Sequence, residues 1–532
     1  MNLTEGTRRS LWPIVAAILF VLLIVTRYCE SGSTRRELEI KAGQWDKLML
    51  ILGEIDRNYV DTLDYSRITE ETIPLLLEKL DPHSVYLPPQ ELKNAEEELQ
   101  GNFDGIGVQF NVPNDTAIVI QVIAGGPSER AGVLSGDRIV EVDGKKVAGV
   151  KMDQDSLVSM LKGKSGTVVK VGFKRGNSKA ILKLDIKRDK IPVKSVDVSY
   201  MVDETTGYLK LSKFTRTSHK EVLESLNALQ KEGMKSLIVD LRGNTGGYLD
   251  QALLLSNEFL DKGSLIVYME GLHRKREDYF ADGRGNFRGI NLKVLIDEGS
   301  ASSSEIFAGA IQDNDRGTII GRRSFGKGLV QEPIYFSDKS GIRLTVARFY
   351  TPTGRSIQKP YRDDYRNDII ERYKHGELTS VDSIKQDASL KYSTPKGKIV
   401  YGGGGITPDI FVPIDTTGIT KFFIKSNELG LVFRYSSEIA DLYRSDLRRI
   451  KNLKELNNFL NSKNLEKGFL DYAAKRDIIP SSEEWKLSGP ILITQLKALV
   501  GRYSSMDDNA YYPIISEIDN VIKVAKEDST GQ

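Results

Sequence analysis

The spacing of apolar positions along the chain changes three times, and each change marks a different kind of structure. Between residues 35 and 95 apolar side chains recur every three to four positions, first from Leu48 to Tyr59 and again from Leu75 to Leu80. This period places them on one face of a helix, so we predict an N-terminal helical region. Asp81-Pro82 ends the second stripe, because proline stops a helix.

Short runs with strand-like composition follow between residues 96 and 190. Apolar β-branched residues dominate these runs, and Gly, Pro and Asp separate them, as in a small β-rich domain. We predict strands at 105–110, 117–120, 138–142 and 168–173, and short helices at 128–132 and 157–161.

Strands and helices alternate between residues 191 and 414, which predicts α/β architecture. The run Leu237–Leu241 is apolar at nearly every position, as in a strand that is buried on both faces. Further strands are expected at 208–211, 294–296 and 318–320, and helices at 222–229, 252–260 and 305–311.

Beyond residue 414 the chain becomes charged and helical again. Its apolar positions indicate amphipathic helices that pack on the core, on a second copy of the chain or on an adaptor. They include Leu442, Leu447, Ile450, Leu453 and Leu456. We therefore expect five segments, at residues 1–34, 35–95, 96–190, 191–414 and 415–532.

Composition excludes several classes of function. The 75 basic and 73 acidic residues nearly cancel, so no basic field indicates nucleic acid. The single cysteine, Cys29, excludes an internal disulfide framework and a cysteine-based zinc site. The four histidines have no metal-binding spacing, and we predict neither a metal nor another cofactor.

The first segment carries an apolar run from Leu11 to Val25, preceded by Arg8 and Arg9. This pattern is typical of a signal peptide or a signal anchor. No Ala-x-Ala cleavage pattern follows it, so a retained anchor is favoured over a cleaved signal. The arginines predict an N-terminus in the cytoplasm, with the rest of the chain outside it.

A serine and a lysine are the strongest candidates for chemistry. Ser302 lies in a cluster of serines at the start of the helix predicted at 305–311, and Lys327 lies past the next strand, between Gly326 and Gly328. A serine hydroxyl needs a base, and a lysine that burial keeps neutral can be that base. The run from Gly321 to Gly328 nearly matches a phosphate loop. It lacks the final hydroxyl, and a strand instead of a helix is expected after it.

The segment from Gly101 to about Lys190 resembles a PDZ domain. Three blocks carry the resemblance: Gly105-Ile106-Gly107-Val108, Gly126–Val133, and Gly136–Ile139 followed by Asp143-Gly144. The resemblance implies that a C-terminal peptide adds to a strand edge, with its carboxylate on the backbone N–H groups of residues 105–108.

A second resemblance covers residues 75–414. The serine cluster, the Lys327 block and Asp240–Gly247 resemble the C-terminal processing peptidases, also called tail-specific proteases. The resemblance implies that Ser302 is the nucleophile and Lys327 the general base, and that Gln331 orients the lysine. Ser303 can offer a backbone N–H to the oxyanion. The second donor is Gly246 or Gly247, of which Gly247 is preferred.

The expected function is therefore that of a serine endopeptidase that recognises the C-terminal tails of protein substrates through its PDZ-like domain. The implied location is the bacterial cell envelope, outside the cytoplasm. The alternative is a catalytically silent scaffold that binds protein C-termini. A third hypothesis, acyl transfer on small thioesters, is disfavoured by the peptide-binding module.

Overall fold

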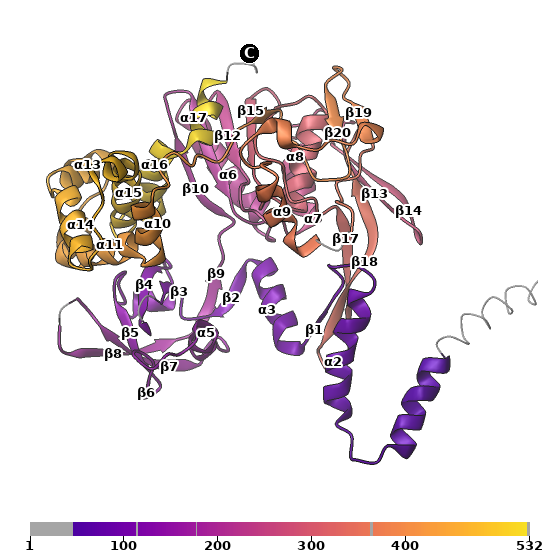
Figure 1. Ribbon diagram of the computed structural model, residues 1–532, viewed down its shortest axis with the longest axis horizontal. Coiled ribbons are helices and arrows are strands. Elements are labelled where there is room, and N and C mark those ends of the chain that lie inside the picture. The colour runs from indigo at the N-terminus through magenta and orange to yellow at the C-terminus, as the bar shows by residue number, and fades with distance from the viewer. Residues whose placement is uncertain (1–45, 113–114, 177, 362–364, 529–532) are drawn as a thin grey trace, which may run out of the picture. The chain divides into compact units, whose positions relative to one another are not determined.

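The computed structural model describes residues 46–112, 115–176, 178–361 and 365–528. The expected anchor at residues 1–34 lies outside this range. The chain divides into two compact units, Met1–Leu75 and Leu76–Gln532 (Figure 1). Each unit is described by itself.

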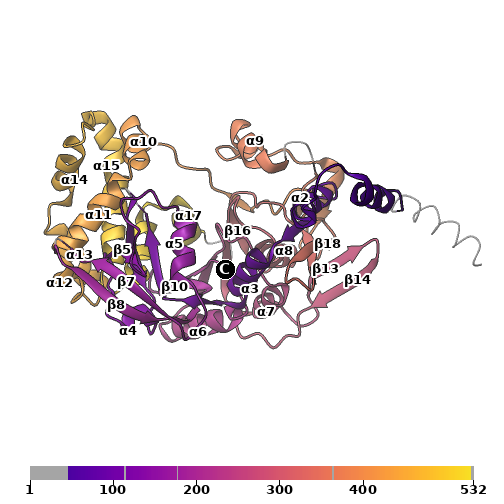
Figure 2. The ribbon, with the colours of Figure 1, turned by 90° about the horizontal axis from the view of Figure 1, so that it is seen from below.

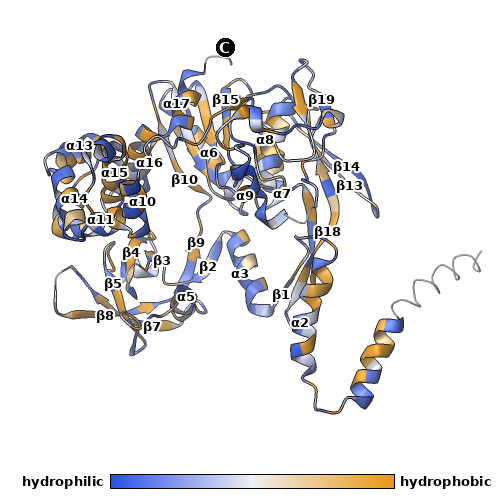
Figure 3. Ribbon diagram, in the orientation of Figure 1, coloured by the Kyte–Doolittle hydropathy of each residue, from blue (hydrophilic) through white to orange (hydrophobic). Residues whose placement is uncertain are grey.

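The first unit contains a helix at residues 46–58 and the start of α2 (Tyr65–Glu78). Both helices carry apolar positions (Figure 3), and several of those on the first helix, Leu48 among them, are exposed. The prediction of helices here is confirmed. Within the described part of the chain, no helix is both long enough and apolar enough to span a membrane.

The second unit begins with the end of α2, the short strand β1 (Val85–Leu87) and helix α3 (Pro89–Gln100). β1 pairs with β18 (Gly341–Tyr350), so the turn at Asp81–Ser84 joins the peptidase part of the molecule. This pairing brings residues 81–84 close to residues that follow them by more than 240 positions along the chain.

The β-rich domain contains an antiparallel sheet in the order β3-β4-β5-β7-β8, with β6 on β5. β3 is an edge strand, and helix α5 packs against its core. The single strand expected at 105–110 is wrong: β2 ends at Gly105 and β3 begins at Val108, because Gly107 turns the backbone with φ +75°. The elements are β2 (Asn102–Gly105), β3 (Val108–Asn111), β4 (Ala117–Val122), α4 (Pro127–Arg130), β5 (Arg138–Val142), β6 (Lys145–Lys146), α5 (Gln154–Leu161), β7 (Val168–Lys174), β8 (Ile181–Lys187) and β9 (Asp189–Pro192), which pairs with β2.

The α/β part is built on a six-stranded sheet in the order β10-β11-β12-β15-β16-β21. All neighbours are parallel except β10 and β11. Helices α6, α7 and α8 cover one face, and α17 (Asn520–Glu527) covers part of the other (Figure 2). The elements are β10 (Val196–Met201), β11 (Thr206–Leu211), α6 (Ser218–Lys231), β12 (Ser236–Asp240), α7 (Leu249–Asn257), β15 (Asn291–Ile296), α8 (Ser303–Asp313), β16 (Thr318–Gly321) and β21 (Ile410–Phe411).

A second, antiparallel sheet in the order β1-β18-β13-β14, with β17 on β18, lies beside this core. It contains β13 (Leu265–Gly271), β14 (Arg274–Phe280) and β17 (Leu329–Tyr335). Short elements fill the stretch before β21: η2 (Tyr365–Asn367), α9 (Asp368–Lys374), η3 (Val381–Ser383), η4 (Ala388–Leu390), β19 (Lys391–Ser393) and β20 (Ile399–Tyr401).

The C-terminal region is helical, as predicted, and has a hydrophobic core of its own. Leu447, Ile450 and Leu456 are buried in that core, whereas Leu442 is exposed. The helices are α10 (Lys421–Glu428), α11 (Leu431–Leu442), α12 (Arg444–Leu447), α13 (Leu453–Asn461), α14 (Leu465–Ala474), α15 (Ser482–Arg502), α16 (Asp508–Ile515) and, after η5 (Ser516–Ile518), α17. The PDZ-like domain thus precedes an α/β peptidase-like core, and helices follow it, as the sequence predicted.

Candidate active site

Ser302 stands at the N-terminus of α8, in a strained backbone conformation. Its φ is +55° and its ψ −114°, a region that a residue with a Cβ rarely occupies. The helix behind it is buried along its entire length, from Ser303 to Asp313. Because buried packing on all sides restricts this helix, it can hold a strained residue at its start.

Glu305, one turn into α8, connects the serine to the lysine segment. Its side chain is fully buried, and its Oε2 accepts the backbone N–H of Ser302 and of Lys327, both at 2.8 Å. Its Oε1 accepts Gly326 N–H at 2.7 Å and the Ser324 hydroxyl at 2.5 Å. Burial raises the pKa of Glu305, and these donors oppose that effect. One carboxylate therefore ties together the two segments that carry the candidate residues.

Lys327 follows β16 in a stretch without regular structure and is held from both sides. The next residue, Gly328, donates its N–H to Gln358 at 3.1 Å. Burial and the neighbouring Arg343 lower the pKa of Lys327, which Glu305 and Asp81 raise to a smaller extent. No carboxylate among the described residues forms an ion pair with its amine. The environment thus favours the neutral amine that a general base requires.

Ser302 and Lys327 line one cavity of about 770 Å³. Gly246, Gly247, Ser303 and Gln331 line the same cavity, and so does Arg343. The structure therefore brings together all the residues predicted for catalysis and for the oxyanion. Gly105–Val108 do not line this cavity but lie in the PDZ-like domain.

Gln331 contacts a residue that the sequence did not connect with it. Its amide Nε2 donates to the backbone carbonyl of His83 at 2.6 Å. The His83 ring lies 2.5 Å from the Tyr365 hydroxyl, and burial together with Lys327 lowers the pKa of His83 to about 4. His83 is therefore neutral at pH 7 and adds no charge beside the lysine.

Ser303 and Gly247 both line this cavity, and their backbone N–H groups have no acceptor among the described residues. The strand-to-helix turn places them close together, since a Cβ on Gly246 would come within 2.9 Å of Ser303 N. Gly247 packs against the backbone so closely that a Cβ would meet the Phe214 carbonyl oxygen at 2.0 Å. Only glycine fits there, and such paired free donors suit an oxyanion.

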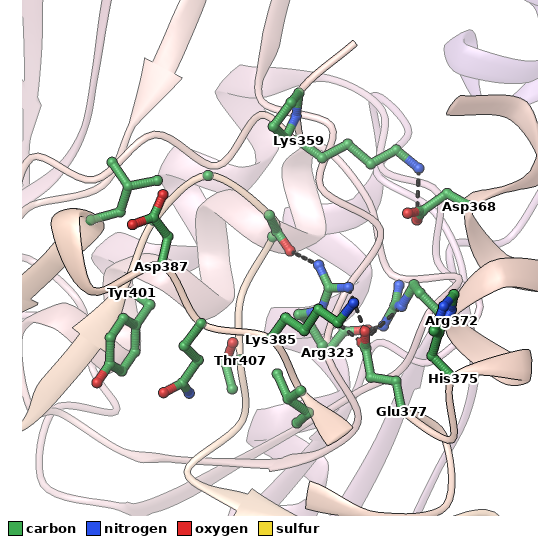
Figure 4. Close-up of a pocket in the computed structure, with 18 of the residues that line it drawn as sticks. Arg323, Lys359, Asp368, Arg372, His375, Glu377, Lys385, Asp387, Tyr401 and Thr407 are labelled. Carbon is green, nitrogen blue, oxygen red and sulfur yellow. Dashed lines mark hydrogen bonds and ion pairs between the residues drawn. The ribbon is translucent and has the colours of Figure 1, made fainter. Parts of the chain in front are cut away.

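A second cavity, of about 400 Å³, is lined by Arg323, Arg372 and Glu377 among others (Figure 4). Glu377 joins Arg323 and Arg372 there, in ion pairs of 2.7 and 2.8 Å. Arg372 also donates to the carbonyls of Arg323 and Ser324, at 2.6 and 3.1 Å. The charged side chains of this cavity thus stabilise the backbone that leads to Lys327.

The loop before β3 offers a further pair of N–H groups. The carbonyls of Ile106 and Gly107 accept the N–H groups of Ser128 and Ile123, both at 3.0 Å. In the described chain, the N–H groups of Ile106 and Gly107 have no acceptor. Val108 and Phe110 on β3 pack in one core with Leu157 and Leu161 of α5.

Sequence reasoning missed the roles of several site residues. Glu305 stood in the serine block, but its contacts with Lys327 depend on the fold. Arg343 belongs to a segment without a recognised motif, and His83 to a block of the family resemblance that was given no role; the pairing of β1 with β18 brings both to the site. The described residues contain no cluster of side chains able to hold a metal ion.

Comparisons with known proteins show which families and relatives this chain is similar to. The pattern of peptidase family S41 matches residues 205–366, that of the PDZ domain residues 105–186, and that of a family of unknown function residues 422–504. The carboxy-terminal processing protease CtpA of Bacillus subtilis is 34% identical over 353 residues, which cover 64% of this chain and 75% of the relative.

A carboxy-terminal-processing protease of Bartonella bacilliformis is 37% identical over 315 residues, which cover 58% of this chain and 71% of the relative. Among solved structures, a photosystem II D1 C-terminal processing protease is 25% identical, with a TM-score of 0.38, over 70% of this chain and 87% of that one. The chain belongs to peptidase family S41 and, within it, to the PDZ-containing carboxy-terminal processing serine proteases.

Proposed function

We propose that this chain cleaves proteins near their C-termini with Ser302 as nucleophile and Lys327 as general base. The observation that carries the proposal is that the Glu305 carboxylate accepts hydrogen bonds from the backbone N–H groups of both residues and so holds them at one cavity. The lowered pKa of Lys327 supports the assignment, because a base must be neutral before it can accept a proton.

The proposed reaction begins when the amine of Lys327 takes the proton of the Ser302 hydroxyl and Oγ attacks the scissile carbonyl. The N–H groups of Ser303 and Gly247 bind the oxyanion of the tetrahedral intermediate. Lys327 then gives its proton to the leaving amine, and an acyl-enzyme remains. Water, deprotonated by the same lysine, attacks the acyl carbonyl, and the lysine returns that proton to Ser302 Oγ as the acyl group leaves as an acid. Gln331 positions the lysine throughout.

We further propose that the PDZ domain selects the substrate by its free C-terminus. The peptide adds to the open edge of β3, and its carboxylate binds the N–H groups of the loop Gly105-Ile106-Gly107-Val108. The free donors at Ile106 and Gly107 and the edge position of β3 support this role. The partners are then proteins with accessible tails.

The test compares a protein substrate carrying a free C-terminal tail with the same substrate amidated at its C-terminus. Ser302→Ala and Lys327→Ala should each lower kcat at least about 10³-fold, as loss of a nucleophile or base does. The matched controls are Lys231→Ala, at an exposed residue of α6, and Ser264→Ala, before β13. Substantial cleavage by Ser302→Ala would reject the nucleophile, and equal cleavage of both substrates would reject carboxylate recognition.

A reactive acylating probe separates this proposal from the silent scaffold. An active enzyme is labelled at Ser302, and the labelling falls in Lys327→Ala. A scaffold that only binds C-termini stays unlabelled. We also propose, from the apolar run Leu11–Val25 alone, that the enzyme is anchored in the bacterial cell envelope and acts outside the cytoplasm. Fractionation of cells with an antibody to the chain tests this location.

A further inference from the structure

The C-terminal helices have no assigned role, yet they contact both the PDZ domain and the catalytic core. Helices α10–α16 form a bundle around their own buried residues, such as Leu431, Leu456 and Leu496. A bundle with its own core does not need the rest of the chain for its packing. Its polar contacts with both neighbours therefore require a separate explanation.

On the PDZ side, two residues at the α11–α12 junction contact the start of β5. Asp441 pairs with Arg138 at 2.8 Å. Arg444 donates to the carbonyl of Ser135 at 2.7 Å and lies 3.5 Å from Asp137, which is fully buried. Both members of the Arg138–Asp441 pair are mostly buried, with 24% and 14% of their side chains exposed. Charges removed from water in this way are strongly disfavoured without their partners.

The backbone of the PDZ domain is shaped for this contact. Gly136 adopts φ +86°, and a Cβ there would come within 2.7 Å of the Arg444 guanidinium. Gln121 on β4 adds a hydrogen bond to Asp507, which precedes α16. Figure 1 shows the helical group beside β3 and β4. These contacts fall on β4, on the turn before β5 and on the first residue of β5, and they leave the outer edge of β3, the proposed peptide site, unpaired.

On the catalytic side, the bundle and the helix α17 that follows it contact the central sheet, through Tyr512 and Asp519 among others. Tyr512 of α16 donates to Asp197 on β10 at 2.7 Å. Asp519, which caps α17, pairs with Arg242 at 2.8 Å, and Arg242 also binds the buried Asp240 at the end of β12. The backbone from Arg242 leads directly to Gly246 and Gly247 of the proposed oxyanion site.

We propose that the α10–α16 bundle is an intramolecular brace that fixes the PDZ domain relative to the catalytic sheet. The two chain segments that connect the PDZ domain to the core would otherwise act as hinges. With the brace in place, a tail bound at β3 stays within a set distance of Ser302, which keeps its effective concentration at the cavity high. This part of the inference rests on the proposed function.

The test uses the full chain with Arg444→Ala and with the milder Asp441→Asn, which keeps the shape and removes the charge. Arg449→Ala is the matched control, because Arg449 is exposed and follows α12 closely. Hydrogen exchange is measured at residues 133–142, together with kcat/KM for the tailed protein and for a short peptide ester that does not need the PDZ domain.

Both variants should exchange faster at residues 133–142 and lose roughly 10-fold in kcat/KM on the tailed protein, while the ester is cleaved at the wild-type rate. Exchange equal to that of the control would overturn the brace, and so would equal losses on tailed protein and ester. Failure of the proposed function is distinguishable: the wild-type enzyme would then not discriminate between free and amidated tails, whatever the exchange result.

Discussion

The proposed nucleophile and the proposed base are held in place by different parts of the structure. Ser302 belongs to a helix whose first turn and full length are buried in the core. Lys327 belongs to a stretch between β16 and β17 that has no regular structure and is held by Glu305, Arg372 and Gln358 from elsewhere in the chain.

This difference predicts which side of the site is more sensitive to single substitutions. Secondary structure and apolar packing place the serine, with one further hydrogen bond from its backbone N–H to Glu305. The lysine depends on a few hydrogen bonds, each of which one substitution removes. Changes on the lysine side should therefore affect activity more than the unfolding free energy, and the following predictions sharpen that contrast.

Glu305→Gln should have the largest effect, because Glu305 serves both sides. In glutamine an NH₂ group replaces one of the two carboxylate oxygens. It would face either the N–H groups of Ser302 and Lys327 or the donors of Gly326 and Ser324, and it would leave those buried donors unpaired. We expect kcat to fall roughly 100-fold and the unfolding free energy to fall by about 3 kcal/mol. Steady-state kinetics and chemical denaturation measure the two. Glu332→Gln, which removes one charge of an exposed ion pair with Arg274, is the control. Equal kcat values in the two variants would contradict the role of Glu305 in holding both segments.

Arg372→Gln should loosen the lysine side alone. The guanidinium holds the carbonyls of Arg323 and Ser324, so its loss should raise hydrogen exchange at residues 322–328 and leave residues 303–313 unchanged. We expect kcat to fall about 10-fold, through misplacement of the base. Lys374→Gln on the exposed side of α9 is the control. Faster exchange in α8 would show that the two sides are not separate.

Arg343→Gln should change the pH dependence of activity. The positive charge of Arg343 lowers the pKa of Lys327, so without it the pKa rises and more of the lysine is protonated near pH 7. The acid limb of the kcat/KM profile should move to higher pH, with a several-fold loss at neutral pH that is recovered in alkaline solution. Arg348→Gln, exposed on the same strand, should leave the profile in place. A loss that persists at high pH would indicate a binding role instead.

Lys327→Met removes the proposed base, and its expected effect on the unfolding free energy is small and depends on pH. The pKa of Lys327 is lower in the folded protein than its ordinary value, so folding disfavours the charged amine. The resulting loss of unfolding free energy is fully present below the folded-state pKa, and it disappears as the pH rises toward about 10.4, the ordinary pKa of a lysine. The inactive variant should thus be more stable than the wild type at neutral pH, and the difference should narrow in alkaline solution. Denaturation at several pH values tests this, with Lys231→Met as the control.

The sequence predicted much of the fold because the relevant signals are local. The buried strand Leu237–Leu241, the helix after Ser302 and the strand after Lys327 all follow from short-range periodicity. The expected strand over 105–110 failed at Gly107, since its positive φ is not visible in a hydropathy pattern. The site residues came from a resemblance, and the structure places six of them around one cavity.

What could not be predicted depends on contacts between distant segments. His83 meets Gln331 across 248 positions, and Arg444 meets Ser135 across 309. No periodicity or motif connects such residues, because only the folded chain decides which loops meet. The same holds for Glu305, whose position was evident but whose four donors come from two segments.

The low pKa of Lys327 has one more consequence. Burial lowers the pKa of Lys327, and the cavity around it is large enough to admit water, which would weaken that effect. Hydration of that space would raise the pKa of the amine, and so lower the fraction of the proposed base that can accept a proton. A bound polypeptide that expels this water would lower the pKa of Lys327 again. Substrate binding would then itself prepare the proposed base for the reaction.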